Sequence, residues 1–114
     1  MTKAVRVTVI SEQDDFKPFN FDLVVGNDER AEGNDWRFGF SSDEEGGLCP
    51  FILKRAKRHN GYEIDFGAGY YAEDEYWETD IYDIKIEIGA AVTIWDNNRK
   101  VYYGKIKQVN QLAP

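Results

Sequence analysis

Short runs of alternating apolar and polar residues recur along this 114-residue chain and limit its possible folds more than any other feature. In residues 3–10, three valines alternate with Arg6 and Thr8. A period of two places successive side chains on opposite faces of a strand, which is typical of a half-buried sheet. The same pattern predicts six further strands, over residues 19–25, 36–40, 62–66, 82–88, 92–95 and 101–106.

Turn-like polar segments follow most of these runs, and 15% of the residues are aromatic. Large aromatic and β-branched side chains suit pleated, half-buried surfaces. An open sheet of so many strands would expose unpaired edges. We therefore expect one mainly β domain over residues 1–114, a small antiparallel barrel or two-sheet sandwich of about seven strands, with a frayed tail over residues 108–114.

Residues 50–60 allow two interpretations. Pro50 suits the first turn of a helix, and the basic residues 54–58 suit its last turn. Asn60-Gly61 suits a helix stop, but it is also a strong hairpin signal that would set Arg58 opposite Glu63. The hairpin register wastes an apolar face, so the sequence slightly favours one short helix near residues 50–60.

The formal net charge of −7 is divided into blocks along the chain. Residues 11–49 carry −8, residues 50–62 carry +4, and residues 63–87 carry −8. A negative surface repels nucleic acid and anionic membranes and attracts basic partners. The charge pattern therefore favours a basic protein as partner.

Neither an export signal nor a membrane span is evident. Residues 1–10 lack the apolar run and cleavage site of a secretory signal. Cys49 is the single cysteine, which excludes an internal disulfide framework. We expect a cytoplasmic protein.

Catalytic chemistry has weak support. His59 is the only histidine, and its basic, polar context indicates an exposed turn or helix end. The acidic loops at residues 27–35 and 43–45 do not match a calcium-binding spacing. We predict no catalytic residue, no metal ligand and no cofactor, and an enzyme is the less favoured interpretation.

Residues 70–80 interleave aromatic and acidic side chains with no regular period. Such a mixture is typical of interfaces, in which Tyr and Trp contribute much of the binding energy. The leading hypothesis is a non-catalytic acidic protein, of the kind of an immunity-type inhibitor, that docks on a basic partner protein. Its predicted partner-binding residues are Tyr70, Tyr71, Glu73, Asp74, Glu75, Tyr76, Trp77, Glu78 and Asp80.

Two alternatives stay open. The basic residues of block 54–58, flanked by aromatic side chains, could bind nucleic acid, although the rest of the chain carries −11 and opposes it. These residues are Lys54, Arg55, Lys57 and Arg58. The abundant carboxylates and aromatic rings could instead serve a carbohydrate-binding or carboxylate-using enzyme domain. The oligomeric state is not predicted.

Overall fold

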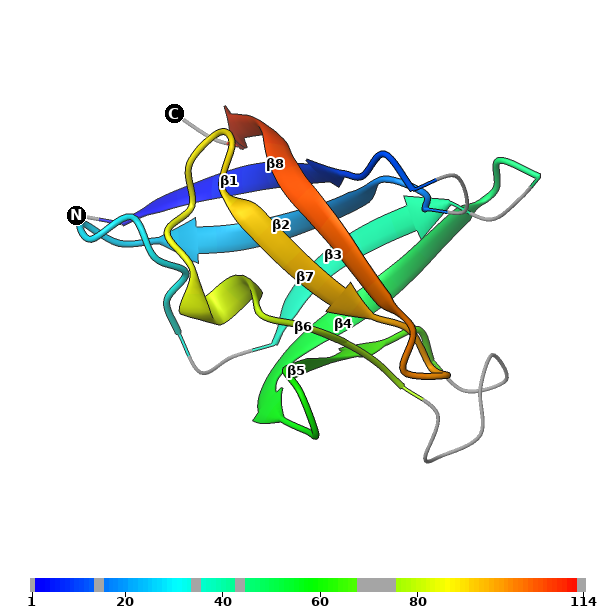
Figure 1. Cartoon of the computed structure of the whole chain (residues 1–114). Coiled ribbons are helices and arrows are strands. Elements are labelled where there is room, and N and C mark those ends of the chain that lie inside the picture. Colours follow the sequence, from blue (N-terminus) through cyan, green and yellow to red (C-terminus); the bar gives the residue numbers. More distant parts are fainter. Residues whose placement is uncertain (1, 14–15, 34–35, 43–44, 68–75, 113–114) are drawn as a thin grey trace.

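Hydrogen bonding between the first and last strands closes the sheet into an antiparallel barrel of eight strands, as the computed structural model in Figure 1 shows. The structure describes every residue except 1, 14–15, 34–35, 43–44, 68–75 and 113–114. Each strand pairs with its neighbour in sequence, so the barrel is a simple meander. The prediction of a small antiparallel β-barrel is confirmed.

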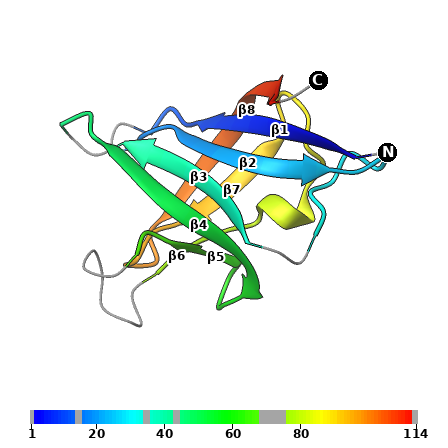
Figure 2. The same cartoon turned by 180° about the vertical axis from the view of Figure 1, so that it is seen from behind.

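The strands differ widely in length. They are β1 (Lys3–Ile10), β2 (Phe19–Val25), β3 (Arg37–Ser42), β4 (Leu48–Lys57), β5 (Tyr62–Asp65), β6 (Trp77–Thr79), β7 (Ala91–Trp95) and β8 (Val101–Gln111). A single turn of 3₁₀ helix, η1 (Ile81–Asp83), lies between β6 and β7. Figure 2 shows the side of the barrel that β1 to β4 form.

Alternation at period two fixes the register of the first hairpin. Val5, Val7 and Val9 are all buried, and they pair with Leu23, Phe21 and Phe19 of β2, which are buried as well. The polar partners between them point outward, where Arg6 bonds Asp22 at 2.7 Å. A shift by one residue would turn both apolar sets to solvent, so the pattern permits one register.

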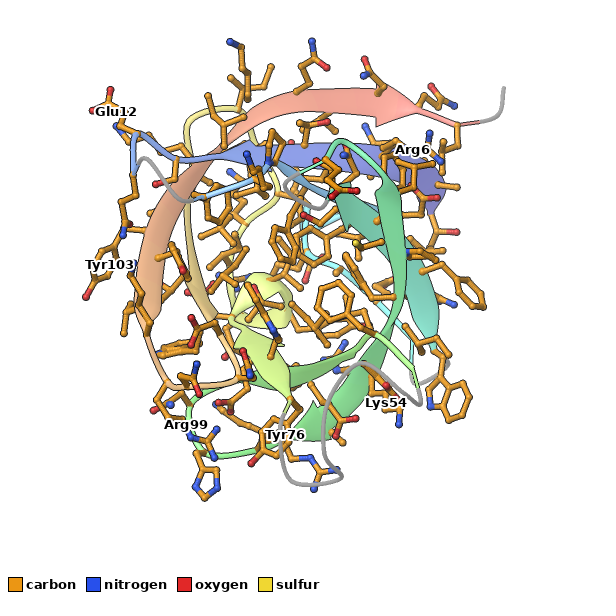
Figure 3. All side chains as sticks on the ribbon, turned by 90° about the vertical axis from the view of Figure 1, so that its right-hand side faces the viewer. Arg6, Glu12, Lys54, Tyr76, Arg99 and Tyr103 are labelled. Atoms are coloured by element: carbon orange, nitrogen blue, oxygen red, sulfur yellow. The ribbon has the colours of Figure 1, made fainter. Side chains whose placement is uncertain are left out.

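Aromatic rings fill the barrel interior, which Figure 3 shows end-on. The ring of Phe19 lies 5.6 Å from Phe16, 5.7 Å from Phe51 and 5.6 Å from Trp77, measured between centroids. Eight strands enclose a space just wide enough for side chains. The interior is therefore a packed core.

The helix predicted near residues 50–60 is wrong, because residues 48–57 form the strand β4. Phe51 and Leu53 are buried in the core, while Leu48, Pro50 and Ile52 lie on the outer side. Because both faces of β4 carry apolar residues, the period of two is hard to recognise. A bulge after Leu53 sets Leu53 opposite Ile64 and removes the wasted apolar face that the simple hairpin register implied.

The strand predicted over residues 82–88 is also wrong. Its first part is the helical turn η1, in which the adjacent residues Ile81 and Tyr82 are both buried. Neighbours in a strand point to opposite faces, so a half-buried strand cannot bury both. Ile86 is buried too, whereas Ile88 is 71% exposed. The segment serves instead as an apolar cover over one end of the barrel.

The tail expected to fray from residue 108 continues as part of β8 as far as Gln111. Val109 pairs with Val7 and Gln111 pairs with Val5. The Leu112 amide donates a further hydrogen bond to the Ala4 carbonyl at 3.0 Å. This end of β8 pairs through its backbone, so the side chains of residues 108–111 gave no clear sign of the strand.

Strand β3 turns its small residues inward. Gly39 and Ser41 are buried, and a Cβ on Gly39 would lie 2.3 Å from the Asn20 carbonyl oxygen and 2.4 Å from the Phe51 ring. No real Cβ makes such contacts without a shift of its neighbours. The absence of a side chain at Gly39 is therefore what admits the Phe51 ring.

We expect Gly39→Ala to lower the free energy of unfolding by about 1–3 kcal/mol, because it overpacks the core against backbone and ring. Urea unfolding followed by fluorescence measures the loss. The outward neighbour Ser42 supplies the control, since Ser42→Ala should change stability by less than about 0.5 kcal/mol. Equal stability of Gly39→Ala and the native chain would contradict the packing described here.

Candidate functional site

The predicted partner-binding segment is described only in part. Tyr70, Tyr71, Glu73, Asp74 and Glu75 lie outside the described residues. The structure places its other four members, Tyr76, Trp77, Glu78 and Asp80, in β6 and beside it. These four do not share one surface, as their contacts show.

The Trp77 side chain belongs to the barrel interior. Its ring lies 5.7 Å from Phe66 and stacks on Tyr102 at 6.2 Å, between centroids. The indole N–H is buried without a hydrogen-bond acceptor among the described residues. Trp77 therefore contributes to the core more than to an outer surface.

The Glu78 carboxylate is fully buried although it lies on the outer side of β6. One oxygen accepts the backbone amides of Asn60 at 2.8 Å and Gly61 at 3.1 Å, and the other accepts Arg99 at 3.0 Å. Paired and hydrogen-bonded in this way, a buried charge is tolerated. Glu78 thereby holds the β4–β5 turn and the β7–β8 turn against β6.

The ring of Tyr76 is in contact with two arginine side chains. The Arg58 and Arg99 guanidinium carbons lie 5.1 and 5.0 Å from its ring centroid. The exposed His59 ring stacks parallel to it at 6.2 Å. Figure 3 shows Tyr76 and Arg99 close together at this corner of the barrel. Tyr76 thus completes a local cluster with Glu78.

Asp80 lies between β6 and η1. Its carboxylate accepts a hydrogen bond from the Thr93 amide at 2.9 Å. Burial raises the pKa of Asp80 above its ordinary value of 3.8, and the Thr93 hydrogen bond opposes this rise. The half-buried carboxylate is thus bonded within the chain.

The alternative nucleic-acid site is the basic block 54–58, at the end of β4. Most of its cations form ion pairs with carboxylates of the same chain. Lys54 bonds Asp65 at 3.0 Å and Glu63 at 3.2 Å, and Arg58 bonds Glu63 at 2.6 Å. Lys57 lies 3.5 Å from Asp83. Arg55 differs, because its guanidinium lies over the Tyr82 ring at 4.3 Å with no carboxylate partner among the described residues.

An apolar surface that the sequence did not indicate lies on the outside of β3 and β4. Because Gly39 and Ser41 face inward, the alternating set Trp36, Phe38 and Phe40 faces outward. Phe38 is 61% exposed and Trp36 is 57% exposed. Across the ladder, Phe38 pairs with Ile52 and Phe40 pairs with Pro50. Leu48, opposite Ser42, is 71% exposed on the same side of β4. We call these six residues the outer aromatic face: Trp36, Phe38, Phe40, Leu48, Pro50 and Ile52.

Two cations hold rings at the border of the outer aromatic face. Arg6, which bonds Asp22, lies 5.1 Å over the Phe40 ring. Lys54, which bonds Glu63 and Asp65, lies 5.2 Å over the Trp36 ring. Cation–π contacts favour one orientation of each ring. The outer aromatic face is therefore ordered at both borders, with Phe38 uncovered at its centre.

Sequence reasoning missed this face because an alternating aromatic set is usually the buried one. The available signal was the opposite set, in which Gly39 and Ser41 are too small to fill a core. A second signal was the apolar run from Leu48 to Leu53, which holds more apolar residues than one face of a strand needs.

Comparisons with protein-family models, with curated proteins and with solved structures found no match for this chain. Among the described residues, no group of three or more His, Cys, Asp or Glu side chains is arranged to hold a metal ion. The described part of the chain also contains no helix with the length and apolarity that crossing a bilayer requires. The site must therefore be interpreted from its own geometry.

We expect Glu78→Ala to lower the free energy of unfolding by about 3–5 kcal/mol, because it removes the acceptor of two backbone amides and of Arg99. Glu78→Gln keeps an acceptor for the Asn60 and Gly61 amides, so its loss should be smaller. Urea unfolding of both variants measures the difference. A Gln variant less stable than the Ala variant would contradict this role.

Asp80→Asn should stabilise the protein more at neutral than at acid pH. The raised pKa means that the folded state binds the Asp80 proton more tightly than the unfolded chain. Ionised Asp80 therefore destabilises the fold increasingly as pH rises through the folded pKa, and Asn avoids this cost while still accepting the Thr93 amide. The test is the stability difference between variant and native chain from about pH 3 to about pH 7. A difference that stays constant or shrinks with rising pH would refute the expectation.

Proposed function

We propose that this chain is a non-catalytic binding protein that docks on a basic partner protein through the outer aromatic face. The observation that carries the proposal is the solvent-exposed ring of Phe38, 61% exposed between the two oriented rings of Trp36 and Phe40. Contiguous exposed apolar residues on a soluble protein mark interaction surfaces. The proposed site thus differs from the segment at residues 70–80 that the sequence favoured.

The energetics suit a protein interface. Each aromatic side chain can bury about 150–250 Å², and aromatic residues are frequent at the centres of interfaces. The flanking ion pairs Arg6–Asp22 and Lys54–Asp65 provide a polar rim around the rings. An apolar centre with a polar rim is the usual anatomy of a protein–protein contact.

The charge of the partner follows from the connections at the two ends of β3. By sequence, the segments 26–35 and 43–47 contain seven acids and one arginine. The acids are Asp28, Glu29, Glu32, Asp35, Asp43, Glu44 and Glu45. An apolar surface between two acidic connections complements a partner whose own apolar patch is bordered by Lys and Arg.

An immunity-type inhibitor of a cationic protein in the cytoplasm is one form that this function could take. Such an inhibitor requires only a small acidic protein with a rigid docking face, and no catalytic activity. His59, which any nucleophile–histidine pair would have to use, is exposed and stacked on Tyr76. Nucleic acid or sugar stacking on the same rings is the competing interpretation.

The test compares substitutions of two exposed aromatic residues on different sides of the barrel. Phe38→Asp places a charge at the centre of the outer aromatic face, whereas Tyr103→Asp places one on β8, where Tyr103 is 71% exposed and points away from the barrel (Figure 3). Proteins captured from source lysate on the native chain are purified, and binding is remeasured with each variant by calorimetry. We expect a basic partner whose affinity falls more than about tenfold with Phe38→Asp, changes little with Tyr103→Asp and weakens as salt rises.

Three results would overturn the proposal. One is a partner that binds Phe38→Asp as tightly as the native chain. Another is capture of nucleic acid or glycan, and of no protein, by the native chain. The third is self-association through the face, seen in sedimentation velocity as a native dimer that Phe38→Asp dissociates.

A further inference from the structure

Three arginines near one end of the barrel have no carboxylate partner in the part of the chain that the structure describes. Arg30, Arg37 and Arg55 form no ion pair with any described residue, although the chain carries 21 acids. Arg37 and Arg55 instead make long contacts of 3.4 Å to backbone carbonyls of residues 31–33. Arginine usually finds a carboxylate or phosphate group, so these side chains have unused capacity to bind an anion.

These arginines lie around a pocket of about 510 Å³ at the end of the barrel. Arg30, Arg55, Gly33 and Tyr82 are among its lining residues. Arg37 contacts the same lining, because its guanidinium lies against Gly33 where a Cβ would be 2.4 Å from the Nη2 atom. We call this site the arginine pocket.

Two polar atoms at the arginine pocket are buried and unbonded. They are the Tyr82 hydroxyl and Nε of Arg37, neither of which has a hydrogen-bond partner among the described residues. A buried donor without a partner costs stability, so native proteins rarely leave one unmet. Tyr82 is itself only 4% exposed. The guanidinium groups can only donate, and the hydroxyl can donate as well as accept, so the site offers several donors to one acceptor.

The two acids that line the arginine pocket are turned back to their own loop. Asp28 accepts the Arg30 amide at 3.1 Å. The Glu32 carboxylate occupies the space beside Gly26, where a Cβ would lie 2.4 Å from its Oε1 atom. Within the described part of the chain, neither carboxylate forms an ion pair with Arg37 or Arg55, so both guanidinium groups keep their capacity to bind an anion.

The walls of the arginine pocket are joined by several contacts, so the site is formed in advance. The β2–β3 connection and the η1 segment lie side by side in Figure 1. Arg30 donates to the Asp83 carbonyl at 2.8 Å, and the Ile86 amide donates to the Glu29 carbonyl at 2.7 Å. Lys85 bonds Glu29 at 3.1 Å across the same junction.

We propose that the arginine pocket binds a small oxyanion, a phosphate or a carboxylate group, held by the guanidinium groups of Arg55 and Arg37 and by the Tyr82 hydroxyl. The hydroxyl adds a neutral donor to two cations, which can satisfy three oxygen lone pairs of one anion. Burial raises the pKa of Tyr82 even though Arg37 and Arg55 lower it, and this favours the protonated hydroxyl that must donate. The proposal concerns a site separate from the outer aromatic face.

Calorimetric titration of the full chain with sodium phosphate and with sodium malonate distinguishes the two sources of the oxyanion. Sodium chloride at equal ionic strength is the reference. We expect saturable binding of at least one of the two anions. Tyr82→Phe should weaken it about tenfold, as loss of a hydrogen bond to a charged group does. Arg55→Gln should weaken it by at least about the same factor.

Tyr82→Phe is the sharpest variant, because it removes only an oxygen that no other described residue bonds. Without anion, it should be at least as stable as the native chain, so a failure to fold cannot mimic a failure to bind. Lys57→Gln, on the same strand but paired with Asp83, is the matched control and should bind within about threefold of native. Phe38→Asp should also bind the anion normally, which separates this test from that of the proposed function.

The proposal is overturned if neither phosphate nor malonate saturates the native chain below about 10 mM, the weak end of specific affinities. It is equally overturned if Tyr82→Phe and Arg55→Gln bind as the native chain does. The first result would mean that water alone fills the pocket, and the second that the anion binds elsewhere.

Discussion

The limited volume inside an eight-stranded barrel is the constraint on which the rest of this structure depends. Such an interior is just wide enough for side chains to fill it. Phe19, Phe21, Phe51 and Trp77 already occupy it. Strand β3 must therefore contribute almost nothing to the interior, which is why Gly39 and the small Ser41 face inward.

That single choice of orientation in β3 accounts for both proposed sites. Since side chains alternate, turning Gly39 inward turns Phe38 and its aromatic neighbours outward. The same alternation turns Arg37 toward the inner side at the end of the barrel, opposite the buried Leu53. One strand thus carries the aromatic rings of the proposed docking face on its outer side and an arginine of the proposed anion pocket on its inner side. Moving β3 by one residue would abolish both.

The sequence predicted the barrel because the period of two is clear wherever one face of a strand is polar, as in β1 and β2. It failed in β4, where the outward Ile52 is as apolar as the inward Phe51, and at Ile81, which begins a helical turn. The outer aromatic face could have been predicted from the small size of Gly39. The arginine pocket could not, since it depends on which basic residues of the folded chain meet a carboxylate and which, like Arg55, do not.

Closure of the barrel has a consequence for how the chain reaches this structure. Val5 pairs with Gln111, so the last ladder joins segments from nearly opposite ends of the sequence. The entropy of bringing such distant segments together opposes this step, and barrels rich in non-local pairs fold in roughly milliseconds to seconds. Until β8 arrives, β1 has an open edge whose backbone groups can pair with another chain. Folding during synthesis can therefore complete this domain only after β8 has left the ribosome, and before then β1 and β7 each keep an edge open to aggregation.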